Sequence, residues 1–359
     1  MKKESYDFLN KLLITPSPSG FETDIQKVVK KRVSKFSDQV SVDVHGNLIA
    51  CFNPAGKIKV MLAGHCDQIG LMVTHISEAG YISVNQIGGI DPSVLPGTNL
   101  VVHTDSGPIE GVIGYPPVHL VPADQRGKKI DLSKVWVDLG LEASKVKKLV
   151  NVGDPITYKL GVTKLGKDKI ASPGCDDKVG LYVVMEALRI VSSKVKGAKK
   201  KNFPIALYSV STVQEEIGLR GARTSCYGID PDVGIAVDVT HATDNPGAEA
   251  KKVGTVNLGA GPTIARGANI NHVLRDLLVS TAKKKKIKHQ HLSAPRATGT
   301  DANAMQITKS GVATALIGIP NRYMHTQVEV IDLKDLDAAA NLLAETVMSI
   351  KPRKSFIPV

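Results

Sequence analysis

The chain has 359 residues, of which 42% are hydrophobic and 22% charged, a composition typical of a soluble globular protein with one large domain or two ordinary ones. No apolar run reaches the roughly 18 residues of a membrane span, so we expect no membrane partner. The net charge of +12 is concentrated in two lysine-rich runs, 194–201 and 283–289, which lack interleaved aromatic residues; we interpret them as solvated helix ends and expect no nucleic-acid partner.

The N-terminal part of the chain predicts helices followed by strands. Helical spacing of apolar residues indicates helices over 4–14 and 22–36, the second introduced by the turn sequence PSPSGFE. Asn10 and Lys11 interrupt the first apolar segment, which argues against a signal peptide. VSVDVHGNLIACF then predicts a hairpin around His45-Gly46, and IKVMLAG (58–64) predicts a buried strand.

The character of the sequence changes between residues 73 and 166. Short alternating segments such as GYISVNQIGG and KVWVDLG are separated by Gly, Pro and Asp turns, and only LEASKVKKLV has a helical period. This pattern predicts a small β-barrel or sandwich. The stretch GVTKLGK (161–167) fits GxxxxGK, but Asp168 replaces the required Ser/Thr and no helix follows, so a hairpin turn is expected there.

Helices and strands alternate again after Gly174. The expected elements are a helix over 177–193, strands at 203–212 and 232–239, a helix around 271–286, a strand at 312–320 and an amphipathic C-terminal helix. The chain therefore predicts an α/β domain formed by residues 1–72 and 167–359, with a β domain inserted at 73–166. Four scattered cysteines without a CxxC pair, Cys51, Cys66, Cys175 and Cys226, predict reduced thiols in a cytoplasmic protein.

Polar residues stand where each predicted core strand ends, and two more precede the helix at 177. The residues at these positions are His65, Asp67, Asp176, Asp177, Glu215, Glu216, Asp238 and His325. Because parallel strands place their carboxyl ends at one edge of a sheet, we expect these side chains to converge. Taken singly, each has an ordinary explanation, such as a helix N-cap for an aspartate. Their coincidence at several strand ends favours a functional site.

So many carboxylates would repel one another without a cation. Histidine and carboxylate ligands without cysteine suit zinc, cobalt or manganese, and their number favours two ions about 3.5–4 Å apart. The adjacent Glu215 and Glu216 need different roles. One can bind metal while the other takes a proton from the activated water, which favours hydrolysis over redox chemistry.

Six motifs carry a resemblance to a known family: HCDQIG, CDDKVG, VQEEIGLRGA, DVTHATDNPG, GTDANA and NRYMHT. In this order, and over essentially the whole chain, they resemble the TET-type dinuclear aminopeptidases of the MH clan, some of which were once labelled endoglucanases. The resemblance implies a mixed-sheet α/β/α metallopeptidase domain (phosphorylase/hydrolase-like) that removes N-terminal residues from unblocked peptides. It also implies that the inserted domain is PDZ-like and mediates homo-oligomerisation, from a dimer up to a tetrahedral dodecamer.

The resemblance implies a role for each strand-end residue. One metal ion would be held by His65, Asp176 and Asp238. The other would be held by Glu216, His325 and the same, bridging Asp176. Glu215 would be the general base, and Asp67 would orient the imidazole of His65.

Some positions need separate comment. Gln68 stands where the family more often has glutamate. Cys66 and Cys175 adjoin proposed ligands, and we interpret them as small buried spacers rather than soft ligands. His241 and Asp301 are candidates for substrate contacts; the alternatives are a turn built by the DNPG that follows His241, and a helix cap for Asp301.

Two other functions remain open from the sequence. A glycoside hydrolase needs only two carboxylates roughly 5–10 Å apart and has no need of the two histidines. Loss of activity on chelation would distinguish it from a metallopeptidase. A non-catalytic scaffold that kept the fold would bind no stoichiometric divalent metal.

Overall fold

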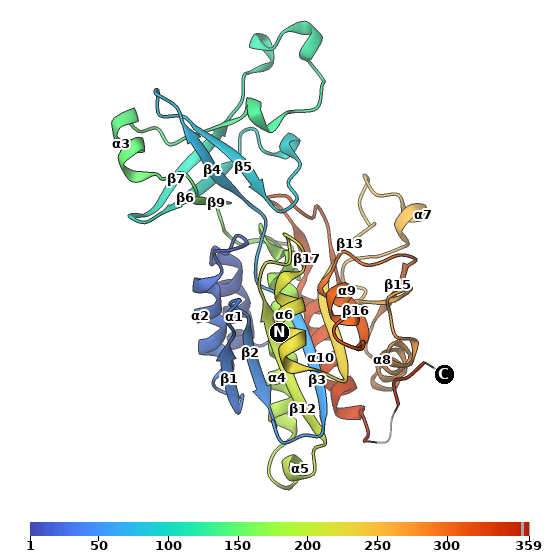
Figure 1. Ribbon diagram of the computed structural model, residues 1–359. Helices are drawn as coiled ribbons and strands as arrows, with labels where there is room; N and C mark the ends of the chain where they lie inside the picture. The colour runs from blue at the N-terminus through green and yellow to red at the C-terminus, as the bar shows by residue number, and fades with distance from the viewer. Residues whose placement is uncertain (353–354, 359) are drawn as a thin grey trace.

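The computed structural model describes residues 1–352 and 355–358, which form an α/β body and a barrel that projects from one end of it (Figure 1). The body is built on an eight-stranded mixed sheet with the strand order β1-β2-β12-β3-β13-β16-β14-β15. The fold class expected from the sequence, an α/β domain with a small inserted β-barrel, is confirmed.

Four parallel strands form the centre of the sheet. They are β12 (Ile205–Thr212), β3 (Ile58–His65), β13 (Val233–His241) and β16 (Ala313–Asn321). Both faces of these strands are buried, which explains why the sequence shows continuous apolar runs rather than alternation. On β3, Val60 and Leu62 pack in the larger core, and Met61 and Ala63 pack in a smaller core on the other face.

Helices cover both faces of the sheet. The larger core is formed with α1 (Lys3–Ile14), α2 (Thr23–Val33), α4 (Cys175–Lys194), α8 (His272–Lys285) and α10 (Leu333–Ser349). The smaller core is formed with α6 (Arg220–Ile229) and α9 (Asp301–Gln306). Alanines such as Ala222 and Ala302 contribute to this second core, so the two helices can approach the sheet closely.

The outer strands differ in how well the sequence predicts them. At one edge, β1 (Gln39–Val42) and β2 (Leu48–Phe52) form the expected antiparallel hairpin. At the other edge, β14 (Thr263–Gly267) and β15 (Gln290–Ala294) were not predicted. β15 alternates between half-buried and exposed residues and has no apolar run that would indicate a strand.

The barrel is closed and antiparallel, with a core of its own. Its strands, in order around the barrel, are β4 (Gly70–Ile76), β5 (Ile82–Ile87), β8 (Trp136–Asp138), β7 (Gly107–Gly114), β6 (Asn99–Thr104) and β9 (Pro155–Tyr158). A short helix, α3 (Ala143–Leu149), packs beside it (Figure 1). The division of the chain at residues 73 and 166 stays a prediction.

Short elements complete the structure. β10 (Thr163–Leu165) and β11 (Lys169–Ala171) form the hairpin expected for GVTKLGK, and β11 also pairs with β17 (Val330–Asp332). The remaining helices of the described residues are α5 (Ala198–Lys201), α7 (Ala250–Val253) and 3-10 turns at Pro92–Val94, Val118–Leu120, Ala123–Gln125 and Leu132–Lys134.

Two further findings concern the chain as a whole. All four cysteines are buried and unpaired. Among residues 1–352 and 355–358, no helix combines the length and the apolarity that crossing a bilayer requires.

Candidate metal centre

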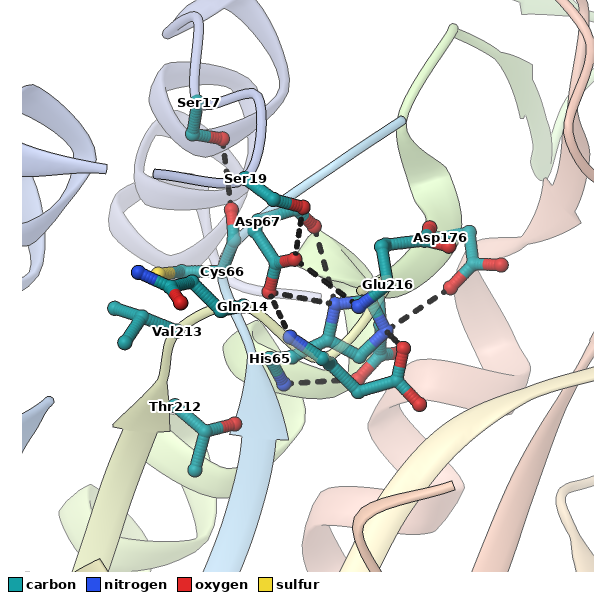
Figure 2. A network of polar contacts seen from close by, with 12 residues as sticks. Ser17, Ser19, His65, Cys66, Asp67, Asp176, Thr212, Val213, Gln214 and Glu216 are labelled. Atoms are coloured by element: carbon teal, nitrogen blue, oxygen red, sulfur yellow. Dashed lines mark hydrogen bonds and ion pairs between the residues drawn. The ribbon is translucent and has the colours of Figure 1, made fainter. Parts of the chain in front are cut away.

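The carboxyl ends of the central strands bring the expected polar residues together. His65 is the last residue of β3, and Asp238 lies near the end of β13. Glu215 and Glu216 lie in the turn after β12, which ends at Thr212. Asp176 lies in the first turn of α4, and His325 lies in the loop after β16. Figure 2 shows His65, Asp176 and Glu216 pointing toward one another.

The first group of side chains surrounds the imidazole of His65. Its Nε2 lies 3.2 Å from Asp176 Oδ1, 3.7 Å from Glu215 Oε2 and 3.9 Å from Asp238 Oδ1. Three carboxylates from three different elements therefore face one imidazole nitrogen.

The second group surrounds the imidazole of His325. Its Nε2 lies 3.2 Å from Asp176 Oδ2 and 3.6 Å from Glu216 Oε2. The two oxygens of Asp176 thus face two different histidines, which is the arrangement a bridging ligand requires. His325 adopts a positive φ of 62°, which is uncommon for a residue with a side chain.

The electrostatics of the cluster favour a positive charge within it. Burial raises the pKa of Glu216 and of Asp238 well above their ordinary values, and the neighbouring Asp176 raises both further. Burial, with Asp238, Asp301 and Asp176 nearby, raises the pKa of Glu215 to about 11 despite the opposing effect of His65. These carboxylates resist ionisation unless a cation compensates them.

The same carboxylates raise the pKa of both histidines, which also indicates that the cluster favours positive charge. The hydrogen bond to Asp176 raises the pKa of His325 to about 9, although its burial opposes this. Burial lowers the pKa of His65, but Glu215, Asp176 and Asp67 more than reverse the effect and hold it well above its ordinary value.

The residues present fit divalent metal ions. The buried atom Glu216 Oε1 accepts no hydrogen bond from any described residue, and Asp176 Oδ1 faces Nε2 of His65 at 3.2 Å, so both oxygens can bind a cation. Two sets of three donor atoms lie within 4.8 Å of one another: His65, Asp177 and Asp238, and His65, Asp176 and Glu216. Imidazole nitrogen with carboxylate oxygen is a donor set that zinc, cobalt and manganese accept.

Asp67 contacts both the imidazole of His65 and the backbone of Glu215 and Glu216. Its Oδ2 accepts hydrogen bonds from Ser19 Oγ at 2.6 Å and from the Glu216 N–H at 3.2 Å, and its Oδ1 accepts the Glu215 N–H at 3.0 Å (Figure 2). Its carbonyl oxygen and Oδ1 lie 3.1 and 3.4 Å from Nδ1 of His65. Asp67 therefore contacts the imidazole that the resemblance implies it orients, and it also holds the Glu215–Glu216 backbone, which the sequence did not indicate.

Two further buried carboxylates were not assigned a role from the sequence. Asp177 accepts hydrogen bonds from the backbone N–H groups of His65 (3.3 Å) and Gly180 (3.0 Å). Glu329 accepts the backbone N–H groups of Asp176 and His325, each at 2.8 Å. The only sequence signal for Glu329 is a charged residue within the apolar stretch VEV (328–330).

The residues next to the proposed ligands pack as buried spacers. Cys66 and Cys175 are fully buried, and burial holds the pKa of each thiol well above its ordinary value. Gln68 accepts a hydrogen bond from Lys178, whose Nζ also donates to the Thr15 carbonyl at 2.8 Å. Burial lowers the pKa of Lys178 to about 7, which makes a neutral glutamine an adequate partner.

The two candidate substrate contacts lie in different environments. His241 is exposed at the end of β13 and lines a cavity of about 620 Å³ together with the 242–253 loop and Tyr323. Asp301 is buried as the first residue of α9, where its Oδ2 accepts the Thr212 hydroxyl at 2.6 Å; the helix N-cap is Thr300. Burial raises the pKa of Asp301 to about 6.

Comparison with known proteins places this geometry in context. Residues 46–342 match the family model of the M42 glutamyl aminopeptidases. A lysyl aminopeptidase of Pyrococcus furiosus is 39% identical over 351 residues, which cover 97% of this chain and 98% of that protein. A TET aminopeptidase from a Thaumarchaeota archaeon has a TM-score of 0.91 at 30% identity and 97% coverage of both chains. The TET1 peptidase of Pyrococcus horikoshii, which can assemble into a tetrahedron or a large octahedral shell, has a TM-score of 0.84 at 28% identity, covering 96% of this chain and 100% of that one.

Proposed function

The chain belongs to the M42 glutamyl aminopeptidase family, and on this premise we propose that it is a metal-dependent aminopeptidase that removes N-terminal residues from short, unblocked peptides. The observation that carries the proposal is the convergence of two imidazoles on the bridging carboxylate of Asp176, each at 3.2 Å. A glycoside hydrolase has no use for this arrangement.

Two divalent ions, zinc or cobalt with manganese as a further candidate, would be held at this site. His65, Asp176 and Asp238 would hold one, and Asp176, Glu216 and His325 the other. When bound, the ions supply Lewis acidity and a water molecule of lowered pKa. Asp67 keeps the imidazole of His65 oriented and fixes the backbone that carries Glu215 and Glu216.

Glu215 would move the proton of the reaction. Its Oε2 lies 3.7 Å from Nε2 of His65, beside the proposed ligands, and its backbone is anchored on Asp67. As general base it would accept a proton from the attacking water. It would then give that proton to the leaving amine nitrogen when the peptide bond breaks, and so return to its starting state.

The free α-amine of an unblocked peptide would be a ligand for one of the two ions. An acetylated nitrogen has no lone pair to offer a metal, so we expect the protein to refuse N-acetylated peptides. The decisive experiment compares lysyl, glutamyl and leucyl p-nitroanilides, each free and N-acetylated, before and after chelation. We expect turnover of free substrates only, its loss on chelation, and its return with zinc, cobalt or manganese.

Variants and rival substrates sharpen that experiment. Glu215→Gln should lower kcat about a hundredfold or more while both metal ions stay bound. Hydrolysis of carboxymethylcellulose that survives chelation would favour the glycosidase instead. A protein that binds no stoichiometric divalent metal at neutral pH would favour a non-catalytic scaffold.

We further propose that the chain forms a homo-oligomer, from a dimer up to a tetrahedral dodecamer, through its barrel. The segment between β7 and β8 exposes Val118 (58%) and Leu120 (75%), apolar side chains that an interface would bury. Light scattering should give the mass of an oligomer that Leu120→Asp reduces; a single-chain mass for the unmodified protein would refute this. The four unpaired, buried thiols support a cytoplasmic location.

A further inference from the structure

The loop that carries His325 is held beside the segment that leads to Asp176. β11 and β17 pair antiparallel, with Ala171 opposite Val330, and the Ser172 N–H donates to the Glu329 carbonyl at 3.0 Å. At the base of the loop, Arg322 and Val330 exchange two backbone hydrogen bonds of 3.0 Å. Two regions far apart in the sequence therefore run side by side up to the metal centre.

The side chain of Glu329 connects these two regions directly. It is 1% exposed, and its oxygens have separate partners: Oε2 accepts the N–H of Asp176, and Oε1 accepts the N–H of His325, each at 2.8 Å. A single carboxylate thus holds the backbones of two residues whose side chains lie 3.2 Å apart at the proposed metal site.

This contact matters because neither backbone group is held by regular secondary structure. Asp176 has non-helical φ and ψ angles within α4, and His325 has a positive φ, a conformation that persists only where its surroundings enforce it. Removing their acceptor would leave the buried N–H of Asp176 without a partner and would release the part-buried N–H of His325. The backbone would then relax, and both side chains would move with it.

We propose that Glu329 is a positioning residue that fixes Asp176 and His325 relative to each other, and so sets the affinity of the metal ion held by Asp176, Glu216 and His325. The inference rests on the ligand assignment of the proposed function. Glu329 would not itself bind metal or substrate. Its effect should therefore appear in metal affinity and should fall mainly on the step to which His325 contributes.

The test is a titration of the chelator-treated, full-length protein with Co²⁺, in which calorimetry and the visible absorption of bound cobalt measure the two binding steps. Glu329→Gln keeps the shape of the side chain but turns one acceptor into a donor that faces an N–H group. Glu329→Asp keeps the charge but is one methylene shorter. His325→Ala identifies the binding step that belongs to the second ion.

Asp335 provides a matched control. It is also fully buried, and its two oxygens accept the backbone N–H groups of Gly259 and Gly261, each at 2.7 Å. Asp335→Asn therefore removes the same kind of backbone clamp from a different part of the chain. It should reduce thermal stability while leaving both cobalt steps unchanged.

We expect both Glu329 variants to weaken the step marked by His325→Ala by about ten- to a hundredfold. The other step should weaken several-fold less, because Glu329 positions only Asp176 among its proposed ligands, whereas it positions both Asp176 and His325 at the step marked by His325→Ala. Wild-type affinities at both steps in a folded Glu329 variant would overturn the inference and leave the proposed function intact. Equal weakening of both steps would also overturn it, since that indicates only a structural role. A wild-type protein that binds no cobalt would refute the proposed function itself.

Discussion

Asp67→Asn is the substitution whose consequences the structure defines most closely. Oδ2 of this carboxylate accepts hydrogen bonds from the Ser19 hydroxyl and the Glu216 N–H, and Oδ1 accepts one from the Glu215 N–H. Asparagine offers one oxygen acceptor and one NH₂ donor. The Ser19 hydroxyl can rotate and accept a hydrogen bond, so the NH₂ group should settle on the Oδ2 side.

The loss of stability in Asp67→Asn depends on which group loses its hydrogen-bond partner. The Glu216 N–H, 3.2 Å from Oδ2, would face a donor and be left unsatisfied, at about 1–3 kcal/mol. The remaining bonds lose their charge assistance, so we expect the free energy of unfolding to fall by about 2–4 kcal/mol in total. The backbone of Glu216 and the imidazole of His65 would also be less well fixed, which should lower kcat/KM by about ten- to a hundredfold.

Urea unfolding and turnover of an aminoacyl p-nitroanilide measure the two effects, with Ser19→Ala as the control. That variant removes the 2.6 Å hydrogen bond from Ser19 to the buried carboxylate of Asp67, which should lower the free energy of unfolding by about 1.5–3 kcal/mol. It leaves the Glu216 N–H bonded to Asp67. It should lose stability without losing more than about threefold in kcat/KM. If Ser19→Ala and Asp67→Asn reduce turnover equally, the backbone of Glu216 is not what Asp67 controls.

Two further predictions concern the barrel and the metal. Gly88 follows β5 with φ +73°, and an added Cβ would lie 3.2 Å from the Cβ of Glu216, so Gly88→Ala should lower kcat/KM about tenfold. Gly97 is the control: it has a similar φ of +79°, but an added Cβ would contact nothing, so Gly97→Ala should carry only the backbone strain of about 1–2 kcal/mol. Chelation should lower the unfolding midpoint because the carboxylates lose their compensating charge. Returning an ion at a hundredfold its Kd should restore about 2.7 kcal/mol per site, and an unchanged midpoint would contradict the electrostatic account.

The centre of the site could be predicted because the strands that lead to it are easy to recognise in the sequence. A strand buried on both faces is a continuous apolar run, and a charged residue directly after such a run is conspicuous, as His65 is after IKVMLAG. Four such strands lie parallel, so their ends had to share one edge of the sheet. The resemblance then distributed roles among residues that the pattern had already located.

The supporting residues could not be predicted in this way. Glu329 and Ser19 form hydrogen bonds with residues far away in the sequence. A local sequence pattern does not indicate which N–H group or carboxylate such a side chain will contact. The helix α6 was missed for a related reason: Gly221 counts against a helix by propensity, yet a Cβ there would lie 2.3 Å from the Val213 carbonyl and Asn47 Oδ1. Close packing, which only the folded structure reveals, requires the glycine.

Glu22 extends this reasoning to pH. It is 6% exposed, and its Oε1 accepts the N–H groups of Gly20 (2.8 Å) and Gln214 (3.1 Å). Burial, together with the charge of Asp67, raises the pKa of Glu22 from 4.5 to about 7 although the bond from Gly20 opposes the shift. Because the folded pKa is the higher one, the stability that this group contributes is complete below pH 4.5 and is lost as the pH rises through about 7.

Glu22→Gln should remove that loss without breaking a contact. Both N–H groups bond to the same oxygen, which an amide retains, so the variant keeps the hydrogen bonds but cannot ionise. Relative to wild type it should gain roughly 2–3 kcal/mol more at pH 8 than at pH 5 in urea unfolding of the metal-loaded protein. A stability difference that stays constant between these two pH values would show that Glu22 is already ionised at pH 5. The anchoring of Gln214, and through it of the Glu215–Glu216 turn, would then depend on the charge of Glu22 rather than on its shape.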